Sequence, residues 1–219
     1  MSVCSYSNIQ LSGLRGVLMD LDDTLYNYEK NHEYALRKVH DELFLGMEYL
    51  EFSQLYRAAR SAVTRRLSPQ GACRSRLFAF QNIFETLGTS QPFVKAYVAD
   101  ELYWDNFIEN MVLAPAAEAF LMRCEQMELP ICIVSDMTAH VQIRKIERLG
   151  LAARIAHLVT SEEVGAEKPD PRMFQAGMHK LGIHRPEDVI MIGDSLEKDV
   201  IGAQSLDIRA FQISLAQEC

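Results

Sequence analysis

Several patterns are missing from this sequence, and each absence excludes a class of protein. No run approaches the roughly 18 apolar residues of a membrane-spanning helix, and residues 1–13 lack the basic and apolar regions of a secretory leader. The 22 basic residues are outnumbered by 30 acidic ones, so the net charge of −8 disfavours unspecific binding to nucleic acid or anionic membranes. We therefore expect a cytoplasmic protein whose partner is a small molecule, with no nucleic acid and no membrane involved.

The cysteines and histidines also lack the spacings of structural metal sites. The five cysteines are odd in number and include no C-x-x-C pair, so we expect reduced thiols rather than a zinc site or a redox dithiol. Cys132 stands within the apolar run 131–134 and is interpreted as a small buried hydrophobe. The six histidines include no H-x-x-x-H spacing. Zinc chemistry is not expected.

What the sequence does contain is the alternation of an α/β fold. With 219 residues and 48% apolar content, the chain can form one large domain or a core with an insertion. Short apolar runs typical of buried parallel strands occur at 15–21, 129–136, 156–161, 188–194 and 208–214. Helical patterns occupy 115–128, 138–149, 171–181 and 196–206. The alternation predicts a doubly wound, mainly parallel, Rossmann-like sheet.

One long segment interrupts this alternation. Residues 29–111 contain no convincing strand and show only helical periodicity of their apolar residues. We interpret them as a helical-bundle cap inserted after the first strand, where it would cover the carboxyl ends of the strands. Residues 14–28 and 112–219 would then form the catalytic core, and residues 1–13 a weakly ordered leader.

Polar residues with a common chemistry follow the predicted strands. They are Asp20, Asp22 and Thr24 after the first strand, Ser135 and Asp136 at the second, Lys168 in the loop after the third, and Asp194 and Asp199 after the fourth. Ligands of open α/β sheets bind beyond the carboxyl ends of the strands, so these side chains are expected at one edge. Clustered carboxylates repel one another unless a cation compensates them.

The chemistry of this set is limited by the residue types it lacks. No histidine, cysteine or Ser-His pair follows any predicted strand, which disfavours acyl transfer by a catalytic triad. Carboxylates from two strands are hard oxygen ligands that suit Mg²⁺, which also binds phosphate oxygens. Lys168 adds a point charge for a phosphate or for a nucleophilic carboxylate. A carboxylate that attacks phosphorus gives an aspartyl phosphate, an established covalent intermediate.

These residues, in this order, resemble the motifs of the haloacid dehalogenase superfamily. The D-x-D-x-T motif corresponds to Asp20, Asp22 and Thr24, the hydroxyl of the second strand to Ser135, and the lysine to Lys168. The acidic pair stands in "GDSLEKD". The chain looks like the phosphatase branch of the superfamily, subfamily I type, in which a helical cap follows the first strand.

The resemblance implies a role for each catalytic residue. Asp20 would be the nucleophile, and Asp22 would act first as the acid toward the leaving alcohol and then as the base toward water. Ser135 and neighbouring backbone N–H groups would hold the transferring oxygens. Lys168 would compensate the clustered negative charge.

The resemblance also implies a Mg²⁺ cofactor. The ion would be held by the Asp20 carboxylate, the Asp22 carbonyl oxygen and Asp194. Asp199 would support the metal site or Lys168, and Thr24 would fix the loop through a local hydrogen bond.

Three further residues are candidates for substrate binding. Asp136 departs from the family pattern, in which a neutral residue commonly follows the hydroxyl of the second strand, and could accept a bond from a substrate hydroxyl. In the cap, Arg74 and Arg76 belong to an arginine-rich segment and could contact the substrate. The leading hypothesis is therefore a Mg²⁺-dependent phosphatase acting on a small soluble phosphomonoester, of the sugar phosphate or nucleoside monophosphate class.

Four alternatives stay open at this point. A dehalogenase would keep Asp20 but needs neither Asp22 nor a metal, whereas a phosphomutase would keep every residue named above. A receiver module of signalling gathers similar residues but is shorter and has no large insertion. A non-catalytic phosphate-binding protein is the fourth. The sequence indicates no oligomeric state.

Overall fold

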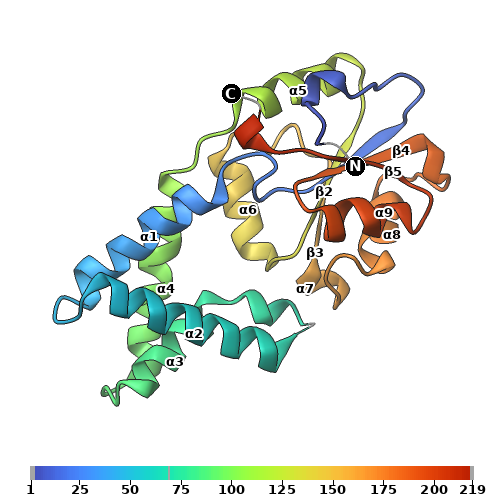
Figure 1. Ribbon diagram of the computed structural model, residues 1–219. Coiled ribbons are helices and arrows are strands. Elements are labelled where there is room, and N and C mark those ends of the chain that lie inside the picture. The colour runs from blue at the N-terminus through green and yellow to red at the C-terminus, as the bar shows by residue number, and fades with distance from the viewer. Residues whose placement is uncertain (1–2, 69, 218–219) are drawn as a thin grey trace.

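The computed structural model describes residues 3–68 and 70–217 (Figure 1). Its sheet contains β1 (Gly16–Met19), β2 (Ile131–Ser135), β3 (His157–Thr160), β4 (Val189–Gly193) and β5 (Arg209–Gln212). All pairs are parallel and the spatial order is β3-β2-β1-β4-β5, so β1 is central between β2 and β4. The predicted doubly wound parallel sheet is confirmed.

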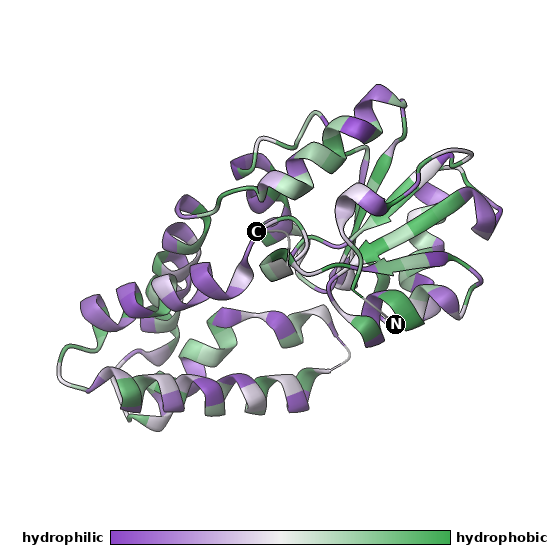
Figure 2. Cartoon of the chain, turned by 45° about the horizontal axis from the view of Figure 1, so that its top comes forward, coloured by the Kyte–Doolittle hydropathy of each residue, from purple (hydrophilic) through white to green (hydrophobic). Residues whose placement is uncertain are grey.

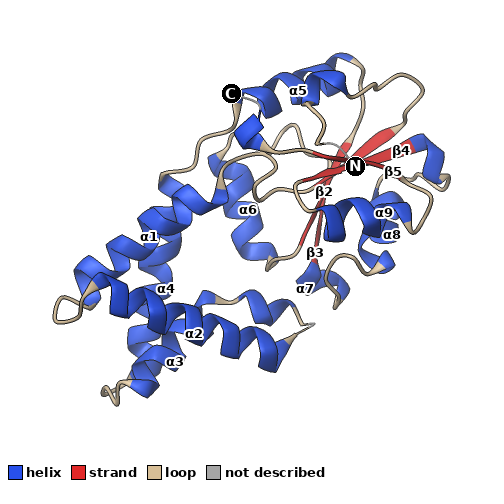
Figure 3. Cartoon of the chain, viewed as in Figure 1, coloured by secondary structure: helices blue, strands red, loops and turns tan. Residues whose placement is uncertain are grey.

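Helices cover both faces of this sheet (Figure 3). Val17 and Met19 of β1 point to one face and Leu18 to the other, as the alternation of side chains along a strand requires. The first face packs against α5 (Pro115–Gln126) and α6 (Ala139–Arg148), and the second against α8 (Pro171–Lys180) and α9 (Gly202–Gln204). Burial on both faces explains why the three central strands, β1, β2 and β4, are nearly continuous apolar runs.

The predicted helix 196–206 is wrong in its first half. Leu196–Ile201 form a π-helical turn, and only Gly202–Gln204 are α-helical. The carboxylate of Asp199 lies under the end of β4, where a Cβ on Gly193 would come within 2.3 Å of the Asp199 Cγ atom. The glycine of "GDSLEKD" is thus required by the packing of Asp199 beneath the strand, and π-turns occur often at functional sites.

The prediction of a weakly ordered leader is also wrong for residues 3–13. Tyr6, Ile9 and Leu11 are buried, and Arg123 of α5 donates hydrogen bonds to the carbonyl oxygens of Tyr6 and Ile9, at 3.0 and 2.7 Å. The Tyr6 hydroxyl donates to the carbonyl oxygen of Thr24. The segment packs because these three apolar residues cover the edge of the core.

Between β1 and α5 the described residues form helices, apart from a single β-bridge between Asp22 and Tyr26, and we call this group of helices the helical insertion. These are α1 (Tyr28–Leu43), α2 (Tyr49–Leu67), α3 (Arg76–Thr86) and α4 (Pro92–Glu109), with the short turn η2 (Gly71–Arg74) before α3. Figure 1 shows this group beside the sheet rather than on either face. Its interior is aromatic, with Phe52, Phe80 and Phe107 fully buried. In Figure 2 its helices carry mixed hydrophilic and hydrophobic residues, whereas the strands are mainly hydrophobic.

The remaining elements are short. They are η1 (Tyr6–Asn8), α7 (Ser161–Val164), η3 (Pro186–Asp188) and η5 (Leu215–Gln217). Among the described residues, no helix combines the length and apolar character needed to cross a bilayer. The four cysteines there are free, and Cys132 is fully buried in β2 as expected, while Cys219 lies outside the described part.

His32, on α1, makes the stability of the helical insertion depend on pH. Burial first, and then the charges of Arg76 and Arg60, lower its pKa from 6.5 to about 3. The unfolded chain therefore binds a proton that the folded one does not, so stability falls as the pH drops below 6.5. Between about pH 7.5 and pH 5, we expect wild type to lose about 1–2 kcal/mol more than His32→Asn, measured by urea unfolding. Equal losses of stability in wild type and His32→Asn would show that His32 does not cause this pH dependence.

Candidate active site

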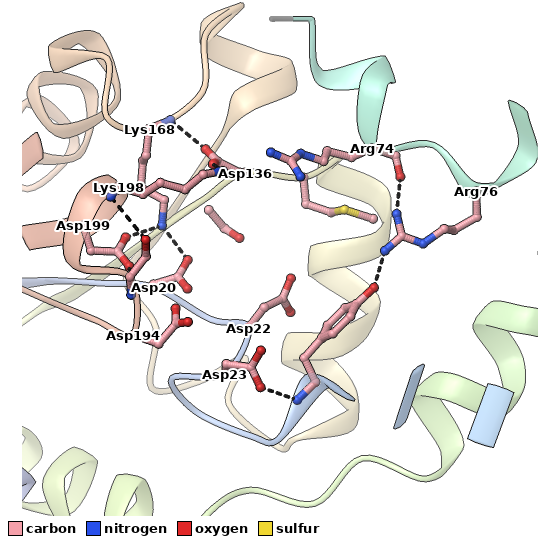
Figure 4. Close-up of a pocket in the computed structure, with 14 residues that line it drawn as sticks. Asp20, Asp22, Asp23, Arg74, Arg76, Asp136, Lys168, Asp194, Lys198 and Asp199 are labelled. Carbon is pink, nitrogen blue, oxygen red and sulfur yellow. Dashed lines mark hydrogen bonds and ion pairs between the residues drawn. The ribbon is translucent and has the colours of Figure 1, made fainter. Parts of the chain in front are cut away.

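Three neighbouring strands end at the same edge of the sheet and present the acidic residues there. Asp20 follows β1 directly, Ser135 is the last residue of β2, and Asp194 follows β4. The order β2-β1-β4 places these ends side by side. They line a cleft of about 400 Å³, and Figure 4 shows the side chains that border it.

Lys168 joins the acidic residues from the loop between α7 and α8. Its Nζ atom lies 2.6 Å from Asp20 Oδ1 and 2.6 Å from Asp199 Oδ1, and its side chain is 3% exposed. Burial disfavours the charged lysine, but Asp199 and Asp20 outweigh this and raise its pKa. Lys168 is therefore a fixed cation that bridges two carboxylates.

The negative charge of the Asp20 carboxylate is only partly compensated by Lys168. Burial raises its pKa well above the ordinary value, Lys168 opposes that effect, and the charges of Asp199, Asp22 and Asp194 raise it further. Thr24 Oγ1 lies 3.5 Å from Asp20 Oδ2, consistent with a local contact that orders the loop. A further cation beside Asp20 would stabilise its charged form.

The residues present fit a divalent metal ion. Carboxylate oxygens of Asp20, Asp194 and Asp199 lie within 4.8 Å of one another. The pKa of Asp194 is raised to about 6 by burial and then by the charges of Asp199 and Asp23. Three closely spaced carboxylates form a hard oxygen donor set, which suits Mg²⁺. The Asp22 carboxylate is not part of this group.

Asp22 instead forms an ion pair that the sequence analysis did not anticipate. Its Oδ1 atom lies 2.7 Å from Nζ of Lys145, on α6, and accepts a hydrogen bond from the Tyr26 hydroxyl. Burial alone would raise the pKa of Asp22, but Lys145 and the bond from Tyr26 lower it. The side chain of Lys145 has no exposed surface. Asp22 is thus held in its charged form by a fully buried lysine.

Aromatic rings surround Lys145 from both parts of the molecule. Its Nζ lies 5.3 Å from the ring centres of Trp104 and Phe107, on α4, and 5.7 Å from that of Tyr26. Ring faces attract a cation and offset part of its desolvation. The helical insertion therefore contributes directly to the environment of Asp22.

Ser135 and Asp136 stand at the end of β2, next to the end of β1, and also line the cleft. Ser135 Oγ accepts a hydrogen bond of 2.5 Å from Gln142 Nε2, and both side chains are buried. Asp136 Oδ1 accepts from the backbone N–H of Lys168 at 2.8 Å, and Oδ2 pairs with Lys198 Nζ at 2.7 Å. Both carboxylate oxygens of Asp136 are thus already bound to protein groups, one to the Lys168 backbone and one to the Lys198 side chain.

The two candidate arginines line the side of the cleft that belongs to the helical insertion. Arg74 forms a two-bond ion pair with Glu167, at 2.6 Å through Nε and 2.7 Å through Nη2. Arg76 is the first residue of α3 and is 8% exposed. The structure brings every predicted site residue to this cleft except Thr24, which lies behind Asp20.

Comparison with known proteins is consistent with this geometry. Residues 14–207 match the model of the haloacid dehalogenase-like hydrolase family. A ribulose-1,5-bisphosphate 5-phosphatase of Halopiger xanaduensis is 31% identical over 92% of this chain and 85% of its own. A glyceraldehyde 3-phosphate phosphatase of Methanopyrus kandleri is 30% identical over 87% and 79%. The crystal structure of a HAD phosphatase from Thermococcus onnurineus superimposes with a TM-score of 0.66, at 24% identity over 92% and 86%.

Proposed function

The chain belongs to the haloacid dehalogenase-like hydrolases, and on that premise we propose that it hydrolyses small sugar phosphates through an aspartyl phosphate on Asp20, with Mg²⁺ as cofactor. The phosphatase names of its relatives assign it to the phosphoric monoester hydrolases. The observation that supports the proposal most strongly is the Lys168 bridge between Asp20 and Asp199, beside Asp194. Membership in this family also excludes the receiver module of signalling, one of the four alternatives that the sequence left open.

In the first step of the proposed reaction, a carboxylate oxygen of Asp20 forms a bond to phosphorus and the ester P–O bond breaks. The leaving oxygen takes a proton from Asp22. Lys145 holds Asp22 charged before substrate binds, but an approaching phosphate dianion raises the proton affinity of this carboxyl and opposes the lysine.

In the second step, water attacks phosphorus, its proton passes to Asp22, and the bond between phosphorus and Asp20 breaks to release phosphate. The charged form of Asp22, which Lys145 favours, is the form that accepts this proton. Ser135 and nearby backbone N–H groups would bind the transferring oxygens, because Ser135 lines the same cleft as Asp20, at the end of the neighbouring strand.

The metal would be held by Asp20, Asp194 and the Asp22 carbonyl oxygen, and it would supply positive charge at the phosphate oxygens. Asp199 would keep Lys168 in place, since it accepts from Lys168 Nζ and from the Ser195 backbone N–H. We also propose that residues 29–111 act as the cap that covers this cleft, with 14–28 and 112–219 as the catalytic core. The aromatic contacts of Lys145 with α4 support this division.

Removal of the metal tests this assignment. We expect hydrolysis of p-nitrophenyl phosphate to stop in a chelator and to return with added Mg²⁺. Asp194→Asn removes an anionic ligand, so the Mg²⁺ concentration for half-maximal activity should rise at least about tenfold, since even outer-sphere partners typically contribute about 10- to 100-fold.

The matched control is Asp207→Asn. Asp207 is exposed and has a left-handed φ of 60°, which asparagine tolerates, so its Mg²⁺ dependence should equal that of wild type. Full activity of wild type in chelator would refute the requirement for a metal ion. An unchanged Mg²⁺ dependence in Asp194→Asn would refute the role of Asp194 as a metal ligand.

A further inference from the structure

Arg76 is a buried cation without an acidic partner. Its residue is 8% exposed, and within residues 3–68 and 70–217 no carboxylate lies within ion-pair distance of its guanidinium. A buried charge is strongly disfavoured unless an opposite charge or a full set of hydrogen bonds compensates it. Such a residue in a binding cleft therefore calls for a ligand that supplies the missing charge.

The neighbours of Arg76 in the protein compensate it only in part. Its Nη1 donates a bond of 2.8 Å to the Arg74 carbonyl oxygen, and its Nη2 donates to the Tyr28 hydroxyl. The Nε atom is buried and has no hydrogen-bond partner. The rings of Trp104 and Tyr103 lie at 5.6 and 5.9 Å from Cζ. The acids whose charge interacts with that of Arg76 are Asp22 and Asp100, and neither forms an ion pair with it.

The other cationic residues that border the cleft are already paired. Arg74 binds Glu167, Lys168 binds Asp20 and Asp199, and Lys198 binds Asp136. Among the described residues that line the cleft, Arg76 alone is a cation without a carboxylate. This property distinguishes it from Arg74, with which the sequence analysis grouped it.

The position of Arg76 determines which part of a ligand it can reach. Figure 4 shows Asp20, Asp194 and Lys168 on one side of the cleft and Arg76 on the other, where it donates a hydrogen bond to the Tyr28 hydroxyl. The region between includes Asp22 and Asp23, which repel anions. Arg76 also lines an adjoining cavity of about 370 Å³, which Arg57, Arg60 and one acid, Glu29, border. Basic side chains thus outnumber acidic ones on the side of the insertion.

We propose that Arg76 binds a second oxyanion of the substrate, a phosphate or carboxylate at the end remote from the phosphate that is hydrolysed. The proposal rests on the proposed function and narrows its substrate class to phosphomonoesters that carry such a second anion. A cleft of about 400 Å³ admits a small metabolite. Repulsion from the acidic side orients the second anion toward Arg76.

Two matched pairs of substrates test the proposal. Ribulose 1,5-bisphosphate and ribulose 5-phosphate differ by the second phosphate, and phosphoserine and phosphoethanolamine differ by the carboxylate. Wild type should prefer the member with the second anion by about 10- to 100-fold in kcat/KM, in at least one pair, as expected for charge-assisted hydrogen bonds. Arg76→Gln should lower kcat/KM for the member with the second anion at least about tenfold more than for the other member, and so remove that preference.

Two further variants separate recognition from a structural role. Arg66→Gln, an exposed residue of α2, should keep the wild-type preference, and Arg76→Lys should keep part of it because it retains the charge. No preference in wild type, or equal losses for both members in Arg76→Gln, would overturn the proposal. If Arg76→Gln does not fold, the substrate preference of wild type and its partial retention in Arg76→Lys still test the proposal. The proposed function would fail separately, by a lack of Mg²⁺-dependent hydrolysis of p-nitrophenyl phosphate.

Discussion

Asp20→Asn is expected to reduce phosphatase turnover to the background rate. An amide does not attack phosphorus, so neither the phosphoenzyme nor its hydrolysis can occur. The fold should survive, because Lys168 keeps its ion pair with Asp199 at 2.6 Å when Asp20 becomes neutral. Phosphate release from p-nitrophenyl phosphate with saturating Mg²⁺ measures the loss, and circular dichroism checks the fold.

Asp207→Asn is again the matched control and should retain full turnover. A folded Asp20→Asn protein with kcat close to that of wild type would contradict the nucleophilic role. A reduced but substantial rate that persists in repeated preparations would contradict it as well, because no other carboxylate is assigned to the attack.

Asp22→Asn is expected to reduce turnover by about 10²- to 10⁴-fold, the usual contribution of general acid–base catalysis. The nucleophile Asp20 remains, so phosphorylation should continue slowly, and fastest with an aryl phosphate whose leaving group needs little protonation. Hydrolysis of the phosphoenzyme should stall, because no base accepts the proton of water. A rapid first turnover followed by a slow steady state, in stopped-flow assays, is the expected signature.

Asp22→Asn also has a structural consequence through Lys145. The variant leaves a fully buried lysine without its carboxylate, and broken buried ion pairs typically cost about 3–5 kcal/mol of stability. The double variant Asp22→Asn/Lys145→Met removes the unpaired charge and should regain much of that stability without regaining turnover. Recovery of turnover in the double variant would show that Asp22 acts only through folding.

The site residues were predictable because each follows a strand in a short local pattern. Asp20, Ser135 and Asp194 stand at the ends of apolar runs, and parallel strands bring their ends to one edge whatever the loops do. Lys168 was found in the loop after the third predicted strand, and the resemblance then gave it a specific role. These contacts depend on the topology of the sheet, which the alternation of strands and helices largely determines.

Lys145 was missed because its partner is 123 residues away in the sequence. A weak signal was available: on α6, Lys145 lies four residues after buried Val141 and one before buried Ile146, on the apolar face of the helix. A lysine on such a face requires an acid or aromatic rings, but periodicity does not tell which. The ion pair of Arg74 with Glu167, 93 residues apart, escaped prediction for the same reason.

The leader and the π-turn were mispredicted for different physical reasons. Residues 3–13 contain only the one-turn helix η1, and their order depends on the tertiary packing of Tyr6, Ile9 and Leu11, which no local pattern reveals. The π-turn Leu196–Ile201 depends on the carboxylate of Asp199 reaching under Gly193 toward Lys168, a tertiary contact that overrides helical propensity.

The central claim is that phosphate is transferred to Asp20. The most direct measurement uses Asp22→Asn, incubated with p-nitrophenyl phosphate and Mg²⁺, quenched in acid and analysed by peptide mass spectrometry. We predict a phosphoryl adduct on Asp20 that hydroxylamine removes, and its absence from Asp20→Asn. An adduct on Ser135, or turnover of Asp22→Asn without any adduct on Asp20, would contradict the mechanism.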